Sequence, residues 1–191
     1  MNGIAASDKI FCLLDLPEPQ QKLESVSENY SIECKDLRFA YEADREILHG
    51  VDMTFHEGSF TAIVGESGCG KSTISVILMG RNKGYTGNIA VGGISLSEIS
   101  EESLMKNFTY ISHQSYLFKG TVRDNLLTAR PNAGEDTLWQ VLEQVNLVDF
   151  LRSENGLETM LNEKASNLSG GQCQRLVLAR ALLHDSPVLP L

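Results

Sequence analysis

The sequence lacks several features that mark secreted and membrane-spanning proteins. Its four cysteines are far apart and form no C-x-x-C pair, which favours neither a zinc site nor a disulfide framework. The longest apolar runs, such as residues 10–14 and 176–178, are far shorter than the roughly 18 residues of a membrane helix. Residues 1–7 lack the basic start and the long apolar stretch of a signal peptide. The cytosol is the expected compartment, and a membrane role would have to come through a partner or a further chain segment.

Basic charge is also scarce. The 16 Lys and Arg residues are scattered and outnumbered by 25 Asp and Glu residues, which gives a net charge of −9. Because a phosphate backbone attracts clustered basic residues, we expect no nucleic acid partner. A local basic site for one nucleotide is compatible with this composition. A length of 191 residues with 42% hydrophobic residues suits one globular domain, or one compact domain with a lobe.

Hydrophobic spacing predicts a mixed α/β chain. Residues 8–16 have helical spacing and end at two prolines, which indicates a short helix followed by a linker. Apolar and polar residues alternate over residues 32–39 and 51–55, as in half-buried strands. Residues 60–64 form a short apolar run bounded by turn residues, which is typical of a strand buried on both faces of a parallel sheet.

A glycine-rich segment follows that predicted strand. Residues 65–72 match G-x-x-x-x-G-K-[ST] at every fixed position and precede an apolar helical run over residues 73–79. Glycines allow backbone N–H groups to surround an anion, and the next helix adds the positive end of its dipole. Lys71 is expected to bridge the β and γ phosphates of a nucleotide, and the Ser72 hydroxyl to bind Mg²⁺. The alternative is a glycine-rich turn with a solvated lysine.

A second glycine-rich segment lies about a hundred residues further on. Ser169 precedes a helical run and Gln172 stands three residues later, which predicts a capping box. Gly170 and Gly171 leave bare N–H groups able to receive a second anion, or the segment is a capped helix start without a ligand. Between the two motifs, apolar residues at helical spacing from 138 to 150 predict a small helical lobe, with Asp136 as N-cap.

Residues 168–172, Leu-Ser-Gly-Gly-Gln, resemble the signature sequence of ATP-binding cassette (ABC) proteins. They lie about a hundred residues after the first glycine-rich loop, as the signature does in that family. The resemblance covers most of the chain, from about residue 32 to 188. It implies a P-loop NTPase (RecA-like) α/β fold with a parallel-sheet core, a small helical lobe over about residues 115–167, and an antiparallel β layer from residues 30–58 and 87–96. The ATP-binding domain would span residues 30–191, with the core sheet incomplete at the C-terminus.

The family resemblance also implies individual roles. Tyr41 stands where the family stacks a ring on adenine, although a strand-end core tyrosine is the alternative. Gln114 resembles the glutamine that reaches Mg²⁺ and senses the γ phosphate, and residues 117–126 resemble the exporter-type sequence that follows it. The expected ATP ligands within one chain are Tyr41, Gly65, Glu66, Ser67, Gly68, Cys69, Gly70, Lys71, Ser72, Thr73 and Gln114, with Ser72 and Gln114 on Mg²⁺. A second subunit would supply Ser169, Gly170, Gly171 and Gln172 to the same ATP.

The implied partners are a second ATPase subunit in a head-to-tail dimer and transmembrane domains at the cytoplasmic face of the cell membrane. Residues 1–29 resemble the linker helix and tail that join an exporter's membrane domain to its ATPase. Residues 163–167 correspond to an acidic segment that contacts the membrane domain in exporters, although Asn162 replaces the usual glycine.

The sequence departs from the family pattern at its C-terminal end. Residues 186–191 stop one residue short of the position of the Mg²⁺ aspartate, and the glutamate that polarises water and the switch histidine would follow later. We therefore expect negligible ATP turnover by this polypeptide and apolar exposure around Ile74 and Val177. Three interpretations remain open: a piece of an exporter-like half-transporter, a soluble ABC ATPase, or a non-catalytic nucleotide-binding module.

Overall fold

Alternating apolar and polar residues build an antiparallel sheet in the computed structural model, which describes residues 29–42, 45–112 and 115–190. The sheet has the order β2-β1-β3-β4. Its strands are β1 (Ile32–Glu42), β2 (Arg45–Phe55), β3 (Thr86–Val91) and β4 (Ile94–Ser95), and they confirm the predicted antiparallel layer. The apolar members of the alternating pattern, such as Leu37 and Val91, are fully buried.

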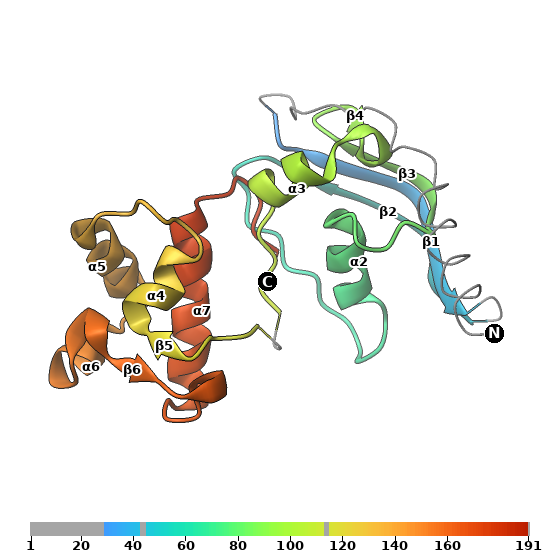
Figure 1. Ribbon diagram of the computed structural model, residues 1–191. Coiled ribbons are helices and arrows are strands. Elements are labelled where there is room, and N and C mark those ends of the chain that lie inside the picture. Colours follow the sequence, from blue (N-terminus) through green and yellow to red (C-terminus); the bar gives the residue numbers. More distant parts are fainter. Residues whose placement is uncertain (1–28, 43–44, 113–114, 191) are drawn as a thin grey trace, which may run out of the picture.

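Two helices pack against the buried side chains of this sheet (Figure 1). Helix α2 (Lys71–Leu78) contributes Ile74 and Ile77 to the core, and α3 (Glu101–Asn107) follows the short 3-10 turn η1 (Leu96–Glu98). The Ser100 side chain accepts a hydrogen bond from the N–H of Ser103 and so caps the start of α3. We call the sheet with these helices the sheet body.

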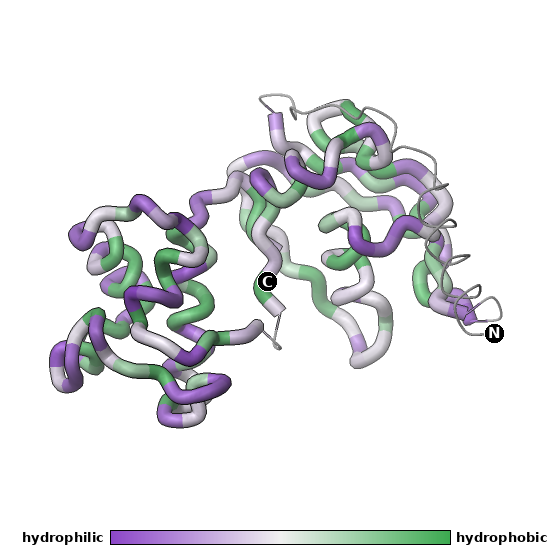
Figure 2. Tube along the Cα trace, in the orientation of Figure 1, coloured by the Kyte–Doolittle hydropathy of each residue, from purple (hydrophilic) through white to green (hydrophobic). Residues whose placement is uncertain are grey.

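The second half of the chain forms a separate helical body (Figure 1). Its elements are β5 (Gly120–Thr121), α4 (Val122–Leu127), α5 (Glu135–Gln144), α6 (Val148–Ser153), η2 (Gly156–Glu158), β6 (Met160–Leu161), η3 (Glu163–Ala165) and α7 (Gly170–His184). Figure 2 shows apolar residues interspersed with polar ones along these helices, and the buried ones form one cluster that includes Leu142 and Leu176. None of the helices in the described ranges combines the length and the apolarity that crossing a bilayer demands.

The predicted cap of α5 was wrong by two positions. Gly134, in extended conformation, is the N-cap, and Asp136 lies in the first turn. Glu135 and Asp136 lie in the first turn, where negative charge interacts favourably with the positive end of the helix dipole. Asp136 therefore indicated the first turn of α5 and not its N-cap.

The parallel core is present as one short pairing. Phe108 and Val188 form a parallel bridge, the N–H of Thr109 donates to the Val188 carbonyl at 2.9 Å, and the N–H of Ile111 donates to the Pro190 carbonyl at 3.0 Å. Pro190 therefore takes part as an acceptor, which requires no N–H group.

The predicted buried strand over residues 60–64 is contradicted. Phe60 and Val64 are each 88% exposed, and the segment is in no strand. A central strand needs hydrogen-bonding neighbours, and no other described segment pairs with these residues. A cavity of about 500 Å³ is instead lined by residues 59–63 and 187–190. The expected exposure at Ile74 and Val177 was also wrong, since their exposed fractions are 4% and 6%.

The chain passes between the two bodies near residues 108–112 and again near residues 184–188 (Figure 1). These two crossings are tied together by side chains. The hydroxyl of Ser186 donates to Thr109 Oγ1 at 2.7 Å, and Thr109 Oγ1 lies 2.9 Å from His184 Nδ1. The two bodies are therefore joined by two chain segments, residues 108–112 and 184–188, which hydrogen-bond to each other.

Candidate nucleotide-binding site

The loop over residues 65–70 has the backbone geometry that an anion site needs. Gly68 and Gly70 have φ values of 87° and 96°, which L side chains rarely adopt. A Cβ on Gly70 would lie 2.7 Å from Leu48 Cδ2, so the loop packs closely on β2. Gly70 is the N-cap of α2 and offers no side chain to the first-turn N–H groups. Those groups are left for a ligand at the positive end of the helix dipole.

The amine of Lys71 is held over this loop. Lys71 Nζ donates to the carbonyl of Gly65 at 2.9 Å and to the carbonyl of Glu66 at 2.7 Å, and lies 3.6 Å from Cys69 Sγ. The positive charge therefore sits among the residues whose N–H groups are expected to surround the phosphates. Lys71 and Ser72 also line the same cavity of about 500 Å³. A cationic amine, a hydroxyl and free N–H groups together suit a phosphate with a bound Mg²⁺ ion.

Tyr41 lies at the end of β1 with 61% of its surface exposed. Its ring meets the ring of Phe39 edge-on at 4.8 Å between centroids, and its hydroxyl accepts from Asn82 Nδ2 at 3.3 Å. The exposure argues against the alternative of a buried core tyrosine. Adenine stacking by Tyr41 stays a prediction, and Gln114 lies outside the described residues.

The second motif forms the predicted capping box at the start of α7. Gln172 N–H donates to Ser169 Oγ at 3.3 Å, and Ser169 N–H donates to Gln172 Oε1 at 2.8 Å. The Ser169 hydroxyl accepts in this box and keeps its proton to donate elsewhere. An added Cβ at Gly170 or Gly171 would meet nothing within 4 Å, so this helix start has room for a close approach.

The two glycine-rich motifs belong to different bodies. The start of α2 is in the sheet body, and α7 packs into the cluster of the helical body (Figure 1). The motifs are therefore not brought together on one phosphate within this chain.

Replacing Ser169 with alanine should destabilise the helical body by about 1 kcal/mol, because the box loses its hydroxyl acceptor. Urea unfolding followed by circular dichroism measures the change. Ser166→Ala is the matched control, since Ser166 is exposed and outside the box, and it should stay within about 0.5 kcal/mol of the parent. Equal losses in both variants would contradict a capping role for Ser169.

A strained turn precedes the signature segment. Lys164 and Ala165 are consecutive non-glycine residues in the left-handed region, at φ values of 56° and 51°. Asn167 closes the turn, because its Oδ1 accepts from Asn162 N–H and its Nδ2 donates to the Met160 carbonyl, both at 2.9 Å. Residues 163–167 were expected only to contact the membrane domain, and this clamp was not predicted. The sequence signal that could have predicted the clamp is Asn167, which stands two residues before the capping Ser169.

The strain at Lys164 leads to a stability prediction. Lys164→Gly should stabilise the chain by about 0.5–1 kcal/mol, because glycine adopts a positive φ without a Cβ penalty and Lys164 is exposed. The neighbouring Glu163→Gly is the control, since Glu163 has no positive φ, and it should lose stability. Thermal unfolding of the two variants would contradict the idea if both shifted the midpoint downward.

Asn125 is a structural residue that the sequence did not single out. It is 1% exposed, its Oδ1 accepts from Phe118 N–H at 2.8 Å, and its Nδ2 donates to the carbonyls of Phe118 and Thr121 at 2.9 and 3.0 Å. Asp124 forms a capping box with Thr121, and the hydrogen bonds from Thr121 lower the pKa of Asp124. These contacts fix residues 118–125 as one rigid turn after the segment that contains Gln114.

The fold and the loop over residues 65–72 define the class of P-loop NTPases. The family profile described as ABC transporter matches residues 48–191. The chain is 44% identical over 189 residues to an uncharacterized ABC transporter ATP-binding protein of Haemophilus influenzae, covering 97% of this chain and 34% of the relative. It is 35% identical over 192 residues to the ATP-dependent lipid A-core flippase of Saccharophagus degradans, covering 98% of this chain and 32% of the relative.

A solved structure agrees with these relatives. The structure of a bacterial Atm1-family ABC exporter with ATP bound has a TM-score of 0.88 and 30% sequence identity, and the match covers 98% of this chain and 34% of the exporter chain. The chain belongs to the ABC transporter family and corresponds to its ATP-binding portion. It spans about a third of the length of these relatives, with 34% and 32% of the two proteins covered.

Proposed function

We propose that this chain binds Mg-ATP at residues 65–73 and pairs head-to-tail with a second ATP-binding subunit. The observation that carries the proposal is the uncapped start of α2 at Gly70, with the Lys71 amine held over the same loop. ATP would supply a phosphoanhydride whose γ phosphate is the reacting group. Lys71 would neutralise phosphate charge, Ser72 would bind Mg²⁺, and Tyr41 would stack on the base.

The signature residues complete the proposed site from the other subunit. Ser169, with its hydroxyl proton free, and Gly170 and Gly171 with open space beside them, would contact the γ phosphate held by the partner's loop. Gln114 would reach Mg²⁺ from the segment before the rigid turn of Asn125. Closure of such a pair around ATP excludes water and brings both halves of each site together.

In the longer protein, this chain would couple ATP binding and hydrolysis to substrate movement through transmembrane domains at the cytoplasmic face of a cell membrane. The names of the relatives support that role, since one is a lipid A-core flippase and another, in Escherichia coli, is a glutathione/L-cysteine transport protein that matches 86% of this chain at 34% identity. We propose residues 30–191 as the ATP-binding domain, with a helical lobe over about residues 115–167 and a membrane-domain linker over residues 1–29, most of which lies outside the described residues.

The test is calorimetric titration of the purified chain with Mg-ATP. We expect saturable binding that weakens when Mg²⁺ is removed, because Ser72 would hold the ion between protein and phosphate. Size-exclusion chromatography with and without Mg-ATP tests the pairing, which should increase with nucleotide. A folded chain that shows no heat of binding up to millimolar Mg-ATP would refute the assignment.

Turnover by the 191-residue polypeptide alone should be negligible. Residues 186–191 contain no acidic side chain, and the family resemblance places the Mg²⁺ aspartate and the water-activating glutamate after them. Phosphate release from Mg-ATP should stay near the rate of a sample without protein. Turnover on the order of 1 per second, a common rate for enzymes, would show that other residues activate the water.

A further inference from the structure

Tyr41, the proposed base-stacking residue, presents an exposed ring that depends on its neighbours for support. It stands near the end of β1, with 61% of its surface exposed. The buried ring of Phe39 meets it edge-on, at 90° between the ring planes, so this contact restrains one side of the ring. An exposed side chain loses its freedom to change rotamer when a ligand binds, and that loss weakens binding. The ring is therefore a better stacking surface if a second contact holds it beforehand.

Asn82 supplies that second contact from a different part of the sheet body. Its Nδ2 donates to the Tyr41 hydroxyl at 3.3 Å, across 41 positions of sequence. Asn82 is only partly exposed, so its amide is less mobile than a fully solvated one. The Tyr41 ring is thus held at its edge by Phe39 and at its hydroxyl by Asn82, and its flat faces are left for a planar base.

The segment that carries Asn82 is fixed by the way in which α2 ends. Gly80 has a φ value of 68°, and its N–H donates to the Ile77 carbonyl at 2.8 Å. The next N–H, that of Arg81, donates to the Val76 carbonyl at 3.2 Å. These two bonds form a Schellman motif, which ends a helix in a defined direction. An added Cβ at Gly80 would lie 2.7 Å from a leucine side chain of α3, so the turn before Asn82 is also tightly packed.

Helix α2 connects this support to the phosphate loop. It begins at Lys71, whose amine lies over that loop, and ends at Leu78, so its eight residues span about 12 Å at 1.5 Å per residue. Ile74 and Ile77 anchor the helix in the buried cluster of the sheet body. One packed helix therefore carries the proposed phosphate ligands at its start and, just beyond its end, the partner of the Tyr41 hydroxyl.

We propose that Asn82 is a positioning residue for the nucleotide base, which it serves by holding the Tyr41 ring in its stacking orientation before ATP arrives. The inference rests on the proposed ATP site and adds a residue to it. Asn82 acts through Tyr41, so its contribution depends on the tyrosine hydroxyl and on the presence of a base in the ligand. A residue that only stabilised the fold would show neither dependence.

The first test is a double-mutant cycle read by calorimetric titration of the full 191-residue chain with Mg-ATP. Asn82→Ala should weaken binding about threefold, because the ring must then be ordered by the ligand. Tyr41→Phe keeps the stacking ring and removes the hydroxyl, so it should cause a similar loss. The two changes together should weaken binding no further than either alone, because both remove the same hydrogen bond.

The second test uses magnesium tripolyphosphate, a ligand that has the phosphates of ATP but no base. Asn82→Ala should bind it as the parent chain does, since no ring is stacked in that complex. Asn88→Ala is the matched control, because Asn88 is an exposed asparagine on β3 of the same body. It should bind both Mg-ATP and tripolyphosphate with parental affinity.

Parental affinity of a folded Asn82→Ala chain for Mg-ATP would overturn the positioning role. So would a further threefold loss when Asn82→Ala is added to Tyr41→Phe, or an equal loss for tripolyphosphate. If Asn82→Ala does not fold, Tyr41→Phe removes the same bond, and parental affinity in that variant would overturn the role. In all these results the parent chain still binds Mg-ATP, whereas a parent chain without Mg-ATP binding would refute the proposed function together with this inference.

Discussion

Replacing Lys71 with alanine should weaken Mg-ATP binding about tenfold to a hundredfold. Lys71 Nζ is already held at the loop by the carbonyls of Gly65 and Glu66, so its charge is in position before a nucleotide arrives. A charge-assisted hydrogen bond contributes about 1.5–3 kcal/mol, and each 1.4 kcal/mol is about a tenfold change in affinity. Calorimetric titration with Mg-ATP measures the loss directly.

The matched control for this variant is Lys106→Ala. Lys106 is an exposed lysine in the last turn of α3, so it removes the same charge without touching the loop. Its affinity for Mg-ATP should equal that of the parent chain. Circular dichroism of both variants checks that the fold is kept, and unchanged affinity in folded Lys71→Ala would remove the basis of the proposed site.

Asn125→Ala should cost about 2–3 kcal/mol of stability, the largest loss we expect from a single polar side chain here. The substitution leaves Phe118 N–H and the carbonyls of Phe118 and Thr121 without the partner that the buried Asn125 amide provides. Unsatisfied buried polar groups cost about 1–3 kcal/mol each, and part of that cost is recovered by water. Urea unfolding followed by Trp139 emission reports on this body, because Trp139 lies on α5.

Asn132→Ala provides the comparison for Asn125. Asn132 is exposed in the turn between α4 and α5, and its loss should change stability by less than about 0.5 kcal/mol. Asn125→Asp tests the donors separately, since the carboxylate keeps the contact with Phe118 N–H and loses both donated bonds. If Asn125→Ala and Asn132→Ala unfolded at the same urea concentration, the clamp would not contribute to stability.

The features that the sequence predicted well depend on neighbours close along the chain. The loop ending at Gly70, the helix that begins at Lys71 and the Ser169–Gln172 capping box are all local, and the structure has each of them. Period-2 alternation likewise predicted β1 and the end of β2, because one face of each strand packs on the same core. These local patterns predicted a mixed α/β chain, and the P-loop NTPase fold class, which is also correct, was implied by the family resemblance of residues 168–172.

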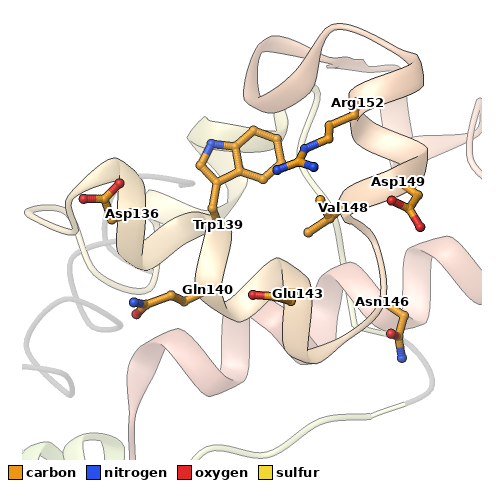
Figure 3. Close-up of a pocket in the computed structure, with 8 residues that line it drawn as sticks. All are labelled: Asp136, Trp139, Gln140, Glu143, Asn146, Val148, Asp149 and Arg152. Carbon is orange, nitrogen blue, oxygen red and sulfur yellow. The ribbon is translucent and has the colours of Figure 1, made fainter.

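Apart from the N-cap of α5, the features that were wrongly predicted or missed depend on contacts that residue spacing does not reveal. Residues 60–64 have the composition of a buried strand, but a strand exists only where another segment pairs with it, and spacing carries no information on that. The clamps at Asn125 and Asn167 reach seven residues to Phe118 and Met160, in turns whose shape spacing does not predict. The groove of about 630 Å³ between α5 and α6 (Figure 3) could not be predicted from the sequence either, because it arises from the packing of α6 against α5.

The separation of the start of α2 and the start of α7 into different bodies has a genetic consequence. In a head-to-tail pair, each composite pocket takes its loop from one subunit and its serine from the other. Combining a Lys71→Ala chain with a Ser169→Ala chain would therefore concentrate both lesions in one pocket and restore the other to wild-type composition. Two individually defective alleles should complement each other, whereas both changes on every copy of the chain should not.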